Sequence, residues 1–587
     1  MVVAGTGAVS VRFQAGRKKV QKQKKFTNGL TTFFIVLSLA APLLAATVVK
    51  ADAVVEIRNW HDLHAVRDNL AGSYVLMNDL DATTAGYLEL ASEAASEGKG
   101  WQPIGVYREG ESFEPFTGTF DGQGYEIRDL YINRPEGTGV GLFCAVVAEG
   151  RGGVIKNVRV VNVQVTGGSN VGGLAGFNSG NIRDAYCIGE VAGNSSVAGL
   201  VGLNAGNISN SQSSTSTTGM WFVGGLVGYN MEGAISGCHA SGPVTGDILI
   251  GGLVGYNERG TVSNSRSDAS ITGKQGVGGL VGANGEGTVH NSYATSSVTG
   301  DDYVGGLVGH NWGQYQEGIV SNCYAVGRAN GNQLIGGLVG YNDLKGTVRS
   351  SYAAGNVSGD NSIGGLVGYN RGTVRDCYAR GSVTGNASVG GLVGANDNIV
   401  KNSFWDRETS GIQTGSAGVG KTTREMMNIA TFTDTRTEGL DRPWDIIAVT
   451  DGFTNDAYAW NIVAGKGYPF LSGKQFIACD LNIAGTTGGS VIIPGEGAYS
   501  YAAGEVVDLV AKADEGYRFV NWTGDVDTIA DVTAAQTTIA MNSSYTIIPN
   551  FESMPPQPRW PLIVAIVAAV IAIRALLFLV PRRKKKR

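Results

Sequence analysis

Hydrophobic residues in this chain fall in short runs separated by glycine and asparagine, and the runs repeat every 26 to 31 residues. The clearest unit is the phrase GGLVG-x-N, and a weaker copy, GLF, lies at residues 141–143. Such self-similarity predicts a solenoid, in which each unit buries its apolar face against its neighbours. Nine copies of the phrase end at Asn178, Asn204, Asn230, Asn257, Asn284, Asn311, Asn342, Asn370 and Asn396.

Each repeat has three parts. GGLVG-x-N is followed by a segment such as Val289–Ala294 and by a short Val-Thr-Gly ending such as Val298–Gly300. Runs this short, rich in Val and Ile and bounded by Gly and Asn, indicate strands joined by tight turns. No repeat holds an amphipathic stretch long enough for a helix. The sequence therefore predicts an all-β fold, a right-handed parallel β-helix of about ten coils with three strands per coil.

Comparison of the repeats predicts which side chains point inward. One position, from Ile182 to Val400, is always β-branched and apolar, and the motif leucines never vary, so both face the core. Two residues after the β-branched position, Asn or another turn-forming residue predicts a bend that resets the alternation. The small residue after the bend then points inward. Three cysteines occupy this slot and are predicted to be buried free thiols in place of serine, namely Cys238, Cys323 and Cys377.

The next position, which also accepts Arg266 and Gln212, is predicted to be exposed. In five successive coils it is aromatic, and rings spaced by about 4.8 Å should form a ladder. This ladder is the candidate binding surface, although the rings could equally serve only to shield the neighbouring backbone. The motif asparagines should stack as well and pair their amides along the axis as a structural ladder. The five candidate binding residues are Tyr293, Tyr324, Tyr352, Tyr378 and Phe404.

The two ends of the chain predict a location. Residues 1–53 combine a basic stretch, an apolar run and an Ala-x-Ala site, the pattern of a secretory signal peptide cleaved after Ala53 or, alternatively, after Ala46. Residues 554–560 form a Pro-rich linker, and 561–581 are apolar apart from Arg574, long enough to span a bilayer. The basic tail, 582–587, predicts a cytoplasmic C-terminus and an extracellular body.

Between these ends the pattern changes three times. Residues 54–136 precede the repeats and are predicted to cap the solenoid with a short helix that begins after Asn59. The solenoid itself covers 137–410, a closing cap covers 411–476, and a separate β-rich module covers 477–553. The module contains GGSV at 488–491, GYRFVNWTGD at 516–525 and a closing Asn550-Phe551.

The repeated phrase resembles the GLUG motif of bacterial surface and adhesin-like proteins. The module at 477–553 resembles divergent internalin B-repeat modules, in which GG-x-V, GY-x-F-x-x-W and a closing Asn-Phe recur. The two resemblances together cover most of the secreted chain. Neither family brings catalytic residues that could be transferred to this sequence, so the resemblance implies a surface protein without assigning a reaction.

Charge and local motifs exclude several functions. The chain carries −5 overall; residues 1–53 contribute +7 and those after Trp560 another +7, which leaves −19 between them and disfavours nucleic acid as a partner. Residues 415–422, GSAGVGKT, fit a P-loop pattern, but a polar run precedes them, so no nucleotide is expected. His61 and His64 lack a third ligand nearby, and we expect no metal or cofactor.

These observations favour a membrane-anchored, non-catalytic cell-surface protein that adheres, binds a glycan or protein, or acts as a spacer. The rival hypothesis is an envelope-bound, polysaccharide-processing enzyme that uses a groove of the β-helix. The exposed positions of the repeats are mostly Asn, Ser and Tyr and build no ladder of carboxylates, which favours the first hypothesis.

Overall fold

The computed structural model describes residues 53–554, apart from 109–111, 149, 151, 451–453, 466, 473–477, 494, 503–504 and 542–543. The predicted signal peptide (apart from its last residue), the predicted membrane-spanning segment at 561–581 and the basic tail lie outside these ranges. Across the described part of the chain, no helix combines the length and the apolar character that crossing a membrane requires.

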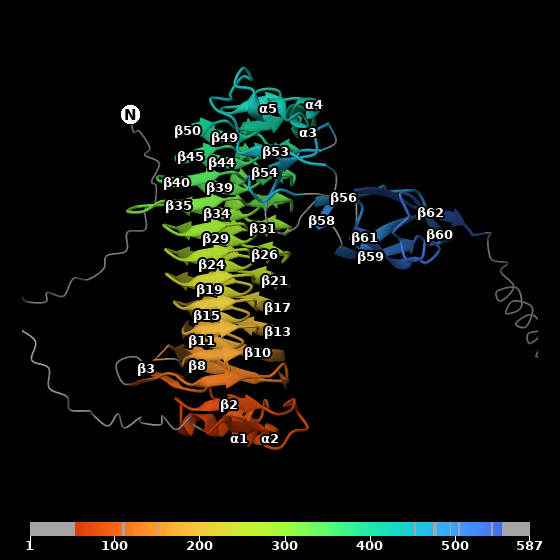
Figure 1. The fold of residues 1–587 in the computed structure, drawn as a ribbon. Coiled ribbons are helices and arrows are strands. Elements are labelled where there is room, and N and C mark those ends of the chain that lie inside the picture. The colour runs from red at the N-terminus through yellow and green to blue at the C-terminus, as the bar shows by residue number, and fades with distance from the viewer. Residues whose placement is uncertain are drawn as a thin grey trace, which may run out of the picture. The chain divides into compact units, whose positions relative to one another are not determined.

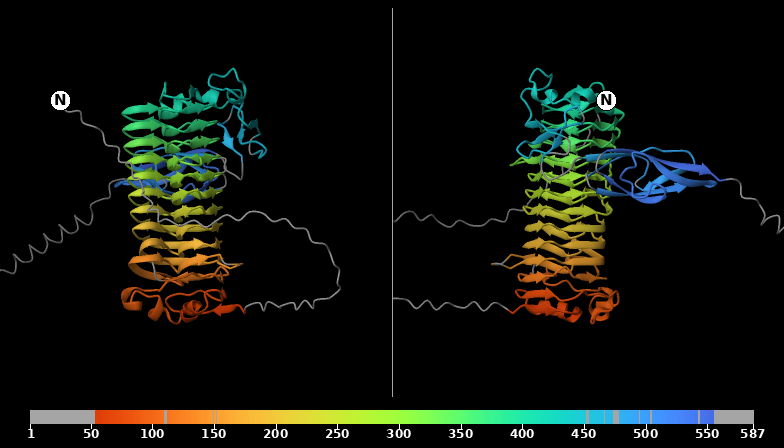
Figure 2. Two further views of the ribbon diagram at one scale, coloured as in Figure 1. Left: turned by 90° about the vertical axis from the view of Figure 1, so that its left-hand side faces the viewer. Right: turned by 45° about the vertical axis from the view of Figure 1, so that its right-hand side comes forward.

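The repeats form a parallel β-solenoid, whose coils lie one above another in Figures 1 and 2. The GGLVG-x-N phrases supply one ten-stranded sheet, paired in register from coil to coil. Its first strand contains Phe143, so the weak copy at 141–143 also contributes a strand to this sheet. The strands are β8 (Phe143–Val147), β11 (Ala175–Ser179), β15 (Val201–Asn204), β19 (Val227–Met231), β24 (Val254–Glu258), β29 (Val281–Gly285), β34 (Val308–Trp312), β39 (Val339–Asn342), β44 (Val367–Asn370) and β49 (Val393–Asn396).

A second, thirteen-stranded sheet carries the β-branched inward position at the centre of each rung. It starts inside the N-terminal cap, because three of its strands precede the repeats. They are followed without interruption by the strands of the coils. The order is β1 (Val55–Ile57), β2 (Ser73–Leu76), β5 (Thr119–Asp121), β9 (Val154–Lys156), β12 (Asn181–Arg183), β16 (Asn207–Ser209), β20 (Ala234–Ser236), β25 (Thr261–Ser263), β30 (Thr288–His290), β35 (Gly318–Ser321), β40 (Gly346–Arg349), β45 (Thr373–Arg375) and β50 (Ile399–Lys401).

The remaining strands pair along the rest of the coil circumference. In the regular coils that begin with β19, a strand of two or three residues follows the bend, a second lies at or near Val-Thr, and a third runs into the next Gly-Gly. They are β6 (Glu126–Arg128), β7 (Tyr131–Val140), β10 (Arg159–Gly172), β13 (Tyr186–Ala192), β14 (Ser195–Ala198), β17 (Gln212–Thr218), β18 (Trp221–Gly224), β21 (His239–Ser241), β22 (Val244–Thr245), β23 (Ile248–Gly251), β26 (Arg266–Ser267), β27 (Ile271–Thr272), β28 (Gln275–Gly278), β31 (Tyr293–Ala294), β32 (Val298–Thr299), β33 (Asp302–Gly305), β36 (Tyr324–Ala325), β37 (Ala329–Asn330), β38 (Gln333–Gly336), β41 (Tyr352–Ala353), β42 (Val357–Ser358), β43 (Asn361–Gly364), β46 (Tyr378–Ala379), β47 (Val383–Thr384), β48 (Ala387–Gly390), β51 (Phe404–Asp406) and β52 (Val419–Lys421).

The structure thus corrects the prediction of three strands per coil, because a regular coil has five short ones. The second predicted segment is split by its bend, and the residues before each Gly-Gly form a strand of their own. The bend itself is confirmed. Its residue has a left-handed backbone in every repeat, with φ of +49° at Asn210, Asn264 and Asn291. This conformation favours Asn, Asp and Gly over other residues, which explains the composition of the position.

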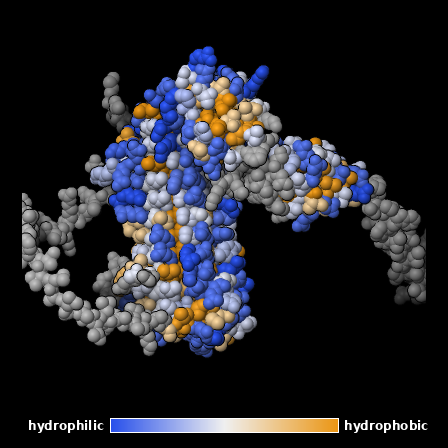
Figure 3. Space-filling model, in the orientation of Figure 1, coloured by the Kyte–Doolittle hydropathy of each residue, from blue (hydrophilic) through white to orange (hydrophobic). Residues whose placement is uncertain are grey.

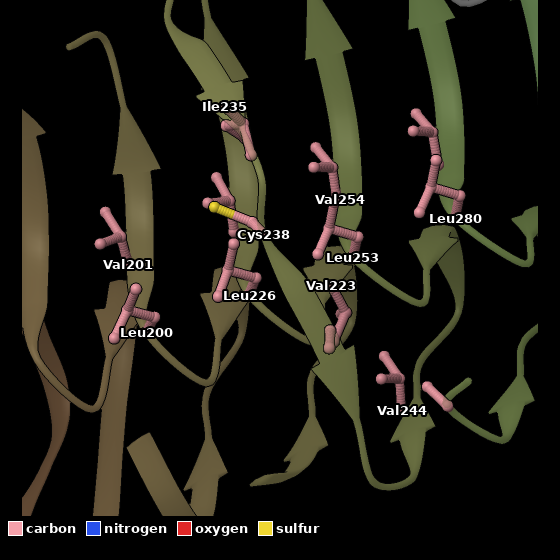
Figure 4. Packing of buried hydrophobic residues seen from close by; sticks show 14 of the residues in the cluster. Leu200, Val201, Val223, Leu226, Ile235, Cys238, Val244, Leu253, Val254 and Leu280 are labelled. Atoms are coloured by element: carbon pink, nitrogen blue, oxygen red, sulfur yellow. The ribbon is translucent and has the colours of Figure 1, made fainter. Parts of the chain in front are cut away.

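The interior of the solenoid is filled by stacked copies of the same side chains (Figure 4). The motif leucines, such as Leu226 and Leu253, are fully buried, as is the β-branched position, represented by Ile235. Glycine before each leucine is required by space: a Cβ at Gly279 would lie 2.0 Å from the carbonyl oxygen of Gly306 in the next coil. A glycine at this position in each coil therefore lets the backbones of successive coils approach to hydrogen-bonding distance.

The cysteine prediction is confirmed for the three coil cysteines. Cys238, Cys323 and Cys377 are buried free thiols, and burial raises the pKa of the Cys323 thiol to about 12. The N–H of Cys238 donates to the hydroxyl of Ser265, which occupies the same slot one coil further on, at 3.1 Å. Ser and Cys are thus interchangeable small inward residues at this position.

The motif asparagines form a continuous chain of side-chain hydrogen bonds inside the stack. Each Nδ2 donates to the Oδ1 of the Asn in the following coil, at 2.7 Å from Asn257 to Asn284 and 2.8 Å from Asn284 to Asn311. The series runs unbroken from Asn178 to Asn396. Because the amides from Asn178 to Asn370 are buried, each one satisfies a polar group that burial would otherwise leave without a partner.

Short helices and irregular segments cover both ends of the stack. At the N-terminal end Asn59 caps α1 (Trp60–His64), and its Oδ1 accepts from the N–H of Asp62 at 2.9 Å. The other elements of this cap are η1 (Ala65–Asp68), α2 (Tyr87–Leu90), η2 (Ala95–Gly98) and the hairpin β3 (Val106–Arg108)–β4 (Ser112–Glu114). The C-terminal cap holds α3 (Arg407–Ser410), α4 (Thr423–Met426), α5 (Ala430–Thr433), β53 (Ile446–Ala448), β54 (Trp460–Ile462) and β55 (Phe470–Leu471).

The C-terminal module has two small sheets with a core of its own. Trp522 and Leu509 are buried in it, and the indole N–H of Trp522 donates to the carbonyl of Ala534 at 3.1 Å. The sheets have the orders β58-β56-β62-β60 and β57-β59-β61. The strands are β56 (Ala478–Ile483), β57 (Gly489–Ile493), β58 (Gly497–Ala502), β59 (Glu505–Ala513), β60 (Tyr517–Gly524), β61 (Gln536–Met541) and β62 (Tyr545–Ser553).

Candidate functional site

Four of the five predicted rings stack as a ladder, and Phe404 instead contacts Phe432 and Trp444 of the cap. The rings of Tyr293 and Tyr324 stack with centroids 4.9 Å apart and planes 5° apart, and Tyr324 stacks on Tyr352 at 5.0 Å. Tyr352 stacks on Tyr378 at 5.0 Å in turn. Parallel pairing of the strands that carry these residues fixes the spacing, because each ring follows its Cα to the next coil.

The prediction that all five rings are exposed is wrong. Tyr352, Tyr378 and Phe404 are 3%, 1% and 0% exposed, because the C-terminal cap packs over the last coils. Trp460 of the cap lies 5.7 Å from the ring of Tyr378, whose hydroxyl donates to the carbonyl of Pro469 at 2.7 Å. The outward rings of these coils therefore form the core beneath the cap, and only Tyr293 and Tyr324 remain half-buried at its edge.

The stacking geometry also limits what the rings can bind. In a nearly parallel stack at about 5 Å, each ring covers a face of its neighbour. Ring edges and hydroxyl groups then point outward instead of ring faces. The half-buried rings of Tyr293 and Tyr324 therefore present edges and hydroxyl groups to a partner and no row of flat surfaces on which sugars could stack.

A groove runs along the solenoid beside this ladder. Its larger part has a volume of about 1090 Å³ and is lined by the bends and the outward slots of successive coils, including Gln212, His239, Arg266, Tyr293 and Tyr324. A second part, about 750 Å³, continues toward the N-terminal cap and shares Asn210 and Gln212 with the first. The two hollows thus adjoin along the stack, and we call them together the coil groove.

Amide side chains at the bends line the coil groove in a repeating order. Asn210, Asn264 and Asn291 are exposed, and the left-handed backbone places the three in the same way. Asn322, half-buried, donates from Nδ2 to the Oδ1 of Asn291 at 3.3 Å. Each amide can donate and accept at the same time, so the wall suits a partner that carries many hydroxyl groups.

The charged groups of the groove are few and mixed in sign. Arg266 donates to the hydroxyl of Tyr293 at 3.5 Å, and the ring of His239 lies 3.0 Å from the carboxylate of Asp268. On the cap side the wall is formed by residues 445, 456–459 and 471–472, which include Asp445 and Asp456. Tyr458, 37% exposed, adds an aromatic ring to this wall. These cap residues could not be found from the sequence, since nothing in their local pattern indicates that they fold back onto the coils.

A second ring ladder, on the ten-stranded sheet, was not predicted. It occupies the variable position of GGLVG-x-N, where Tyr229 stacks on Tyr256 at 5.3 Å and Tyr341 on Tyr369 at 5.3 Å. The signal was present in the sequence, because this position is aromatic in several repeats. Tyr369 donates its hydroxyl to the carboxylate of Asp397, and these rings do not line the coil groove.

The two motifs that suggested other chemistry have structural roles. In the P-loop-like segment Lys421 lies in strand β52, 7% exposed, with its ammonium group 5.7 Å from the ring centroid of Phe404. The following helix, α4, is only four residues long. His61 pairs with Glu89 at 3.2 Å, whereas His64 packs edge-on against Trp101. Among the described residues no group of His, Cys, Asp and Glu could hold a metal ion.

Comparison with known proteins confirms both resemblances. Six successive segments match the GLUG motif, and residues 479–555 match the divergent InlB B-repeat domain. The chain therefore carries GLUG repeats followed by a B-repeat domain. The matched GLUG segments are 223–245, 246–272, 273–299, 300–330, 331–358 and 359–384.

Two curated proteins are similar over part of the chain. Halomucin of Haloquadratum walsbyi is 34% identical over 139 residues, which are 23% of this chain and 1% of halomucin. A protein of Evansella cellulosilytica named "Putative Gly-rich membrane protein" is 34% identical over 125 residues, 20% of this chain and 13% of that protein. The chain thus matches only a small fraction of the length of these relatives.

Proposed function

We propose that this protein is a membrane-anchored cell-surface β-solenoid with a non-catalytic role in adhesion or binding, and that the coil groove is its contact surface. The observation that carries the proposal is the repeating wall of amide and tyrosine side chains along successive coils. The membrane location is supported by the apolar segment at 561–581 and by the name of one relative.

A groove with a repeating wall suits binding better than a reaction. A catalytic site needs a few groups at unique positions, whereas the bends of this wall present an Asn in five of seven successive coils. Figure 3 shows that hydrophilic residues cover most of the visible solenoid surface, with hydrophobic residues at its ends and in places along the stack.

Binding of the purified full chain to arrays of glycans and of cell-surface proteins tests the proposal. The variant Tyr324→Ala removes a half-buried ring of the groove and should weaken binding about tenfold. Tyr369→Ala is the matched control, because it removes a ring of the second ladder, outside the groove, and should leave affinity unchanged. Equal affinities for the two variants, or the absence of any bound partner, would contradict the proposal.

One observation favours the rival function, a polysaccharide-processing enzyme. Asp445 and Asp456 both line the coil groove beside Tyr458, and carboxylate pairs are the usual groups of glycoside hydrolysis. Release of reducing sugar ends from a polysaccharide, abolished by Asp445→Asn or Asp456→Asn, would establish this function. The non-catalytic proposal expects no release by the unaltered protein.

A further inference from the structure

We infer that the coil groove takes an extended, uncharged polysaccharide that lies along the axis of the stack. This inference rests on the proposed function and adds the chemical class, the direction and the minimum length of the partner. Three features of the groove lead to it: its length, the state of its backbone groups and its charge.

The groove is long and its lining is periodic. The bend residues that line it run from Asn157 to Asn322, one from each of seven successive coils. At about 4.8 Å per coil, the six steps between them span about 29 Å. A partner that used the whole wall would itself be extended and would repeat a chemical unit along its length, as a polymer chain does.

The backbone of the groove favours a sugar chain over a peptide strand. A bound peptide strand gains its affinity from unpaired main-chain groups at a sheet edge. Here each strand is paired with the equivalent strand of the coil before and of the coil after. Tyr293, for example, is paired with Arg266 on one side and with Tyr324 on the other. Recognition is left to side chains, and exposed amides at Asn264 and Asn291 can donate to and accept from hydroxyl groups.

The charge of the groove disfavours an acidic polymer. The lining has two arginines, of which Arg159 already pairs with Glu126 at 2.9 Å. Four aspartates lie along the same walls; Asp121 pairs with Lys156 at 2.8 Å and Asp184 with Arg183 at 2.9 Å, while Asp445 and Asp456 on the cap side outnumber Arg266. An anionic polysaccharide would need a cation for each repeating charge and would meet carboxylates instead. An uncharged chain avoids this repulsion and still uses every amide.

The test measures binding of the full chain to soluble hexasaccharides. The uncharged probes are cellohexaose, xylohexaose and mannohexaose, and the charged probe is hexagalacturonate. We expect at least one uncharged hexamer to bind, its disaccharide to bind at least tenfold more weakly, and its affinity to change less than twofold between about 0.1 and 0.5 M salt. Isothermal titration calorimetry gives each affinity.

Substitution of two bend residues then locates the binding. Asn264→Gly with Asn291→Gly removes two amides but keeps the left-handed backbone, since Gly237 occupies the same bend with φ +63°. Loss of two hydrogen bonds should weaken the hexamer about tenfold. Asn170→Gly is the control: its backbone is left-handed too, with φ +50°, and it does not line the groove.

The possible results are distinct. Tighter binding of hexagalacturonate, binding of none of the uncharged hexamers, or equal affinity in the double variant and the control overturns the inference. If a protein or an acidic glycan from the arrays still binds, the proposed function survives without this ligand class. If nothing binds at all, both fail.

Discussion

The sharpest prediction concerns the buried asparagine ladder, because its cost can be worked out bond by bond. In Asn284→Ala the Oδ1 of Asn311 loses its donor at 2.8 Å, and one N–H of Asn257 loses its acceptor at 2.7 Å. The carbonyls of Gly287 and Ile319 also lose Asn284 as a donor, at 3.0 and 3.4 Å, but that of Gly287 keeps the N–H of Ile319 at 2.8 Å. Two buried polar groups are therefore left without partners.

An unsatisfied buried donor or acceptor costs about 1–3 kcal/mol. We therefore expect Asn284→Ala to lower the free energy of unfolding by about 3–4 kcal/mol. At the end of the ladder Asn396 is half-buried and makes a single ladder bond, to Asn370. Water can replace what is lost there, so Asn396→Ala should cost only about 1–2 kcal/mol.

Urea unfolding followed by circular dichroism measures these changes, and hydrogen exchange of the peptides around residue 284 shows whether the defect stays within the adjoining coils, as nearest-neighbour stability predicts. Asn207→Ala is the matched control. It breaks an Asn–Asn bond of 2.9 Å to Asn181, also between successive coils but exposed, and should cost less than about 0.5 kcal/mol. If Asn284→Ala is no more destabilising than Asn207→Ala, the ladder does not stabilise the stack.

Three further predictions concern packing, acid stability and thiol reactivity. Gly279→Ala should destabilise the stack by about 2–3 kcal/mol in urea unfolding, since its Cβ would collide with the next coil. Gly467→Ala should have no effect, because a Cβ there would have no atom of the described residues within 4 Å. Burial raises the pKa of Asp343, but the neighbouring His310 and a backbone N–H outweigh it and hold the pKa at about 2, below the ordinary 3.8. The charged form is thus the stabilising one: its contribution should be complete above about pH 4 and lost as the pH falls toward 2, and Asp343→Asn should flatten thermal stability across that range. Cys323, whose pKa burial raises to about 12, should resist iodoacetamide until the protein unfolds, and rapid labelling of the native protein would show that the stack opens.

The coil could be predicted in detail because every position was sampled nine times. In a single repeat, Asn210 alone would not reveal the backbone conformation at the bend. The occurrence of Asp184, Gly237 and Asn264 at the same position in other repeats indicates a left-handed backbone, and the structure confirms it. The repeats allow equivalent positions to be compared within one chain, a comparison that a single sequence without repeats does not allow. The number of strands per coil could not be obtained in this way, because two-residue strands such as β31 have no periodicity to read.

The site was predicted less well, for a physical reason. Exposure of the aromatic slot was inferred from the residues it accepts, such as Arg266 and Gln212, and in those coils both are exposed. The inference fails for Tyr352, Tyr378 and Phe404, where a segment distant in the sequence packs over the slot. A repeat describes what each coil offers to its neighbours but says nothing about which coils a non-repeating segment will cover.

The cap that hides these rings also builds the end of the groove. Trp460 is buried against Tyr352 and Tyr378, while Tyr458, two residues earlier, faces the groove. Two cap residues close in the sequence thus serve different ends, Trp460 the stability of the cap and Tyr458 the proposed binding wall. Tyr352 belongs to both regions of the ladder, because it is buried beneath the cap and also lines the groove. The aromatic residues of the last coils are therefore explained by packing beneath the cap. Only the half-buried rings of Tyr293 and Tyr324 belong to the proposed binding surface alone.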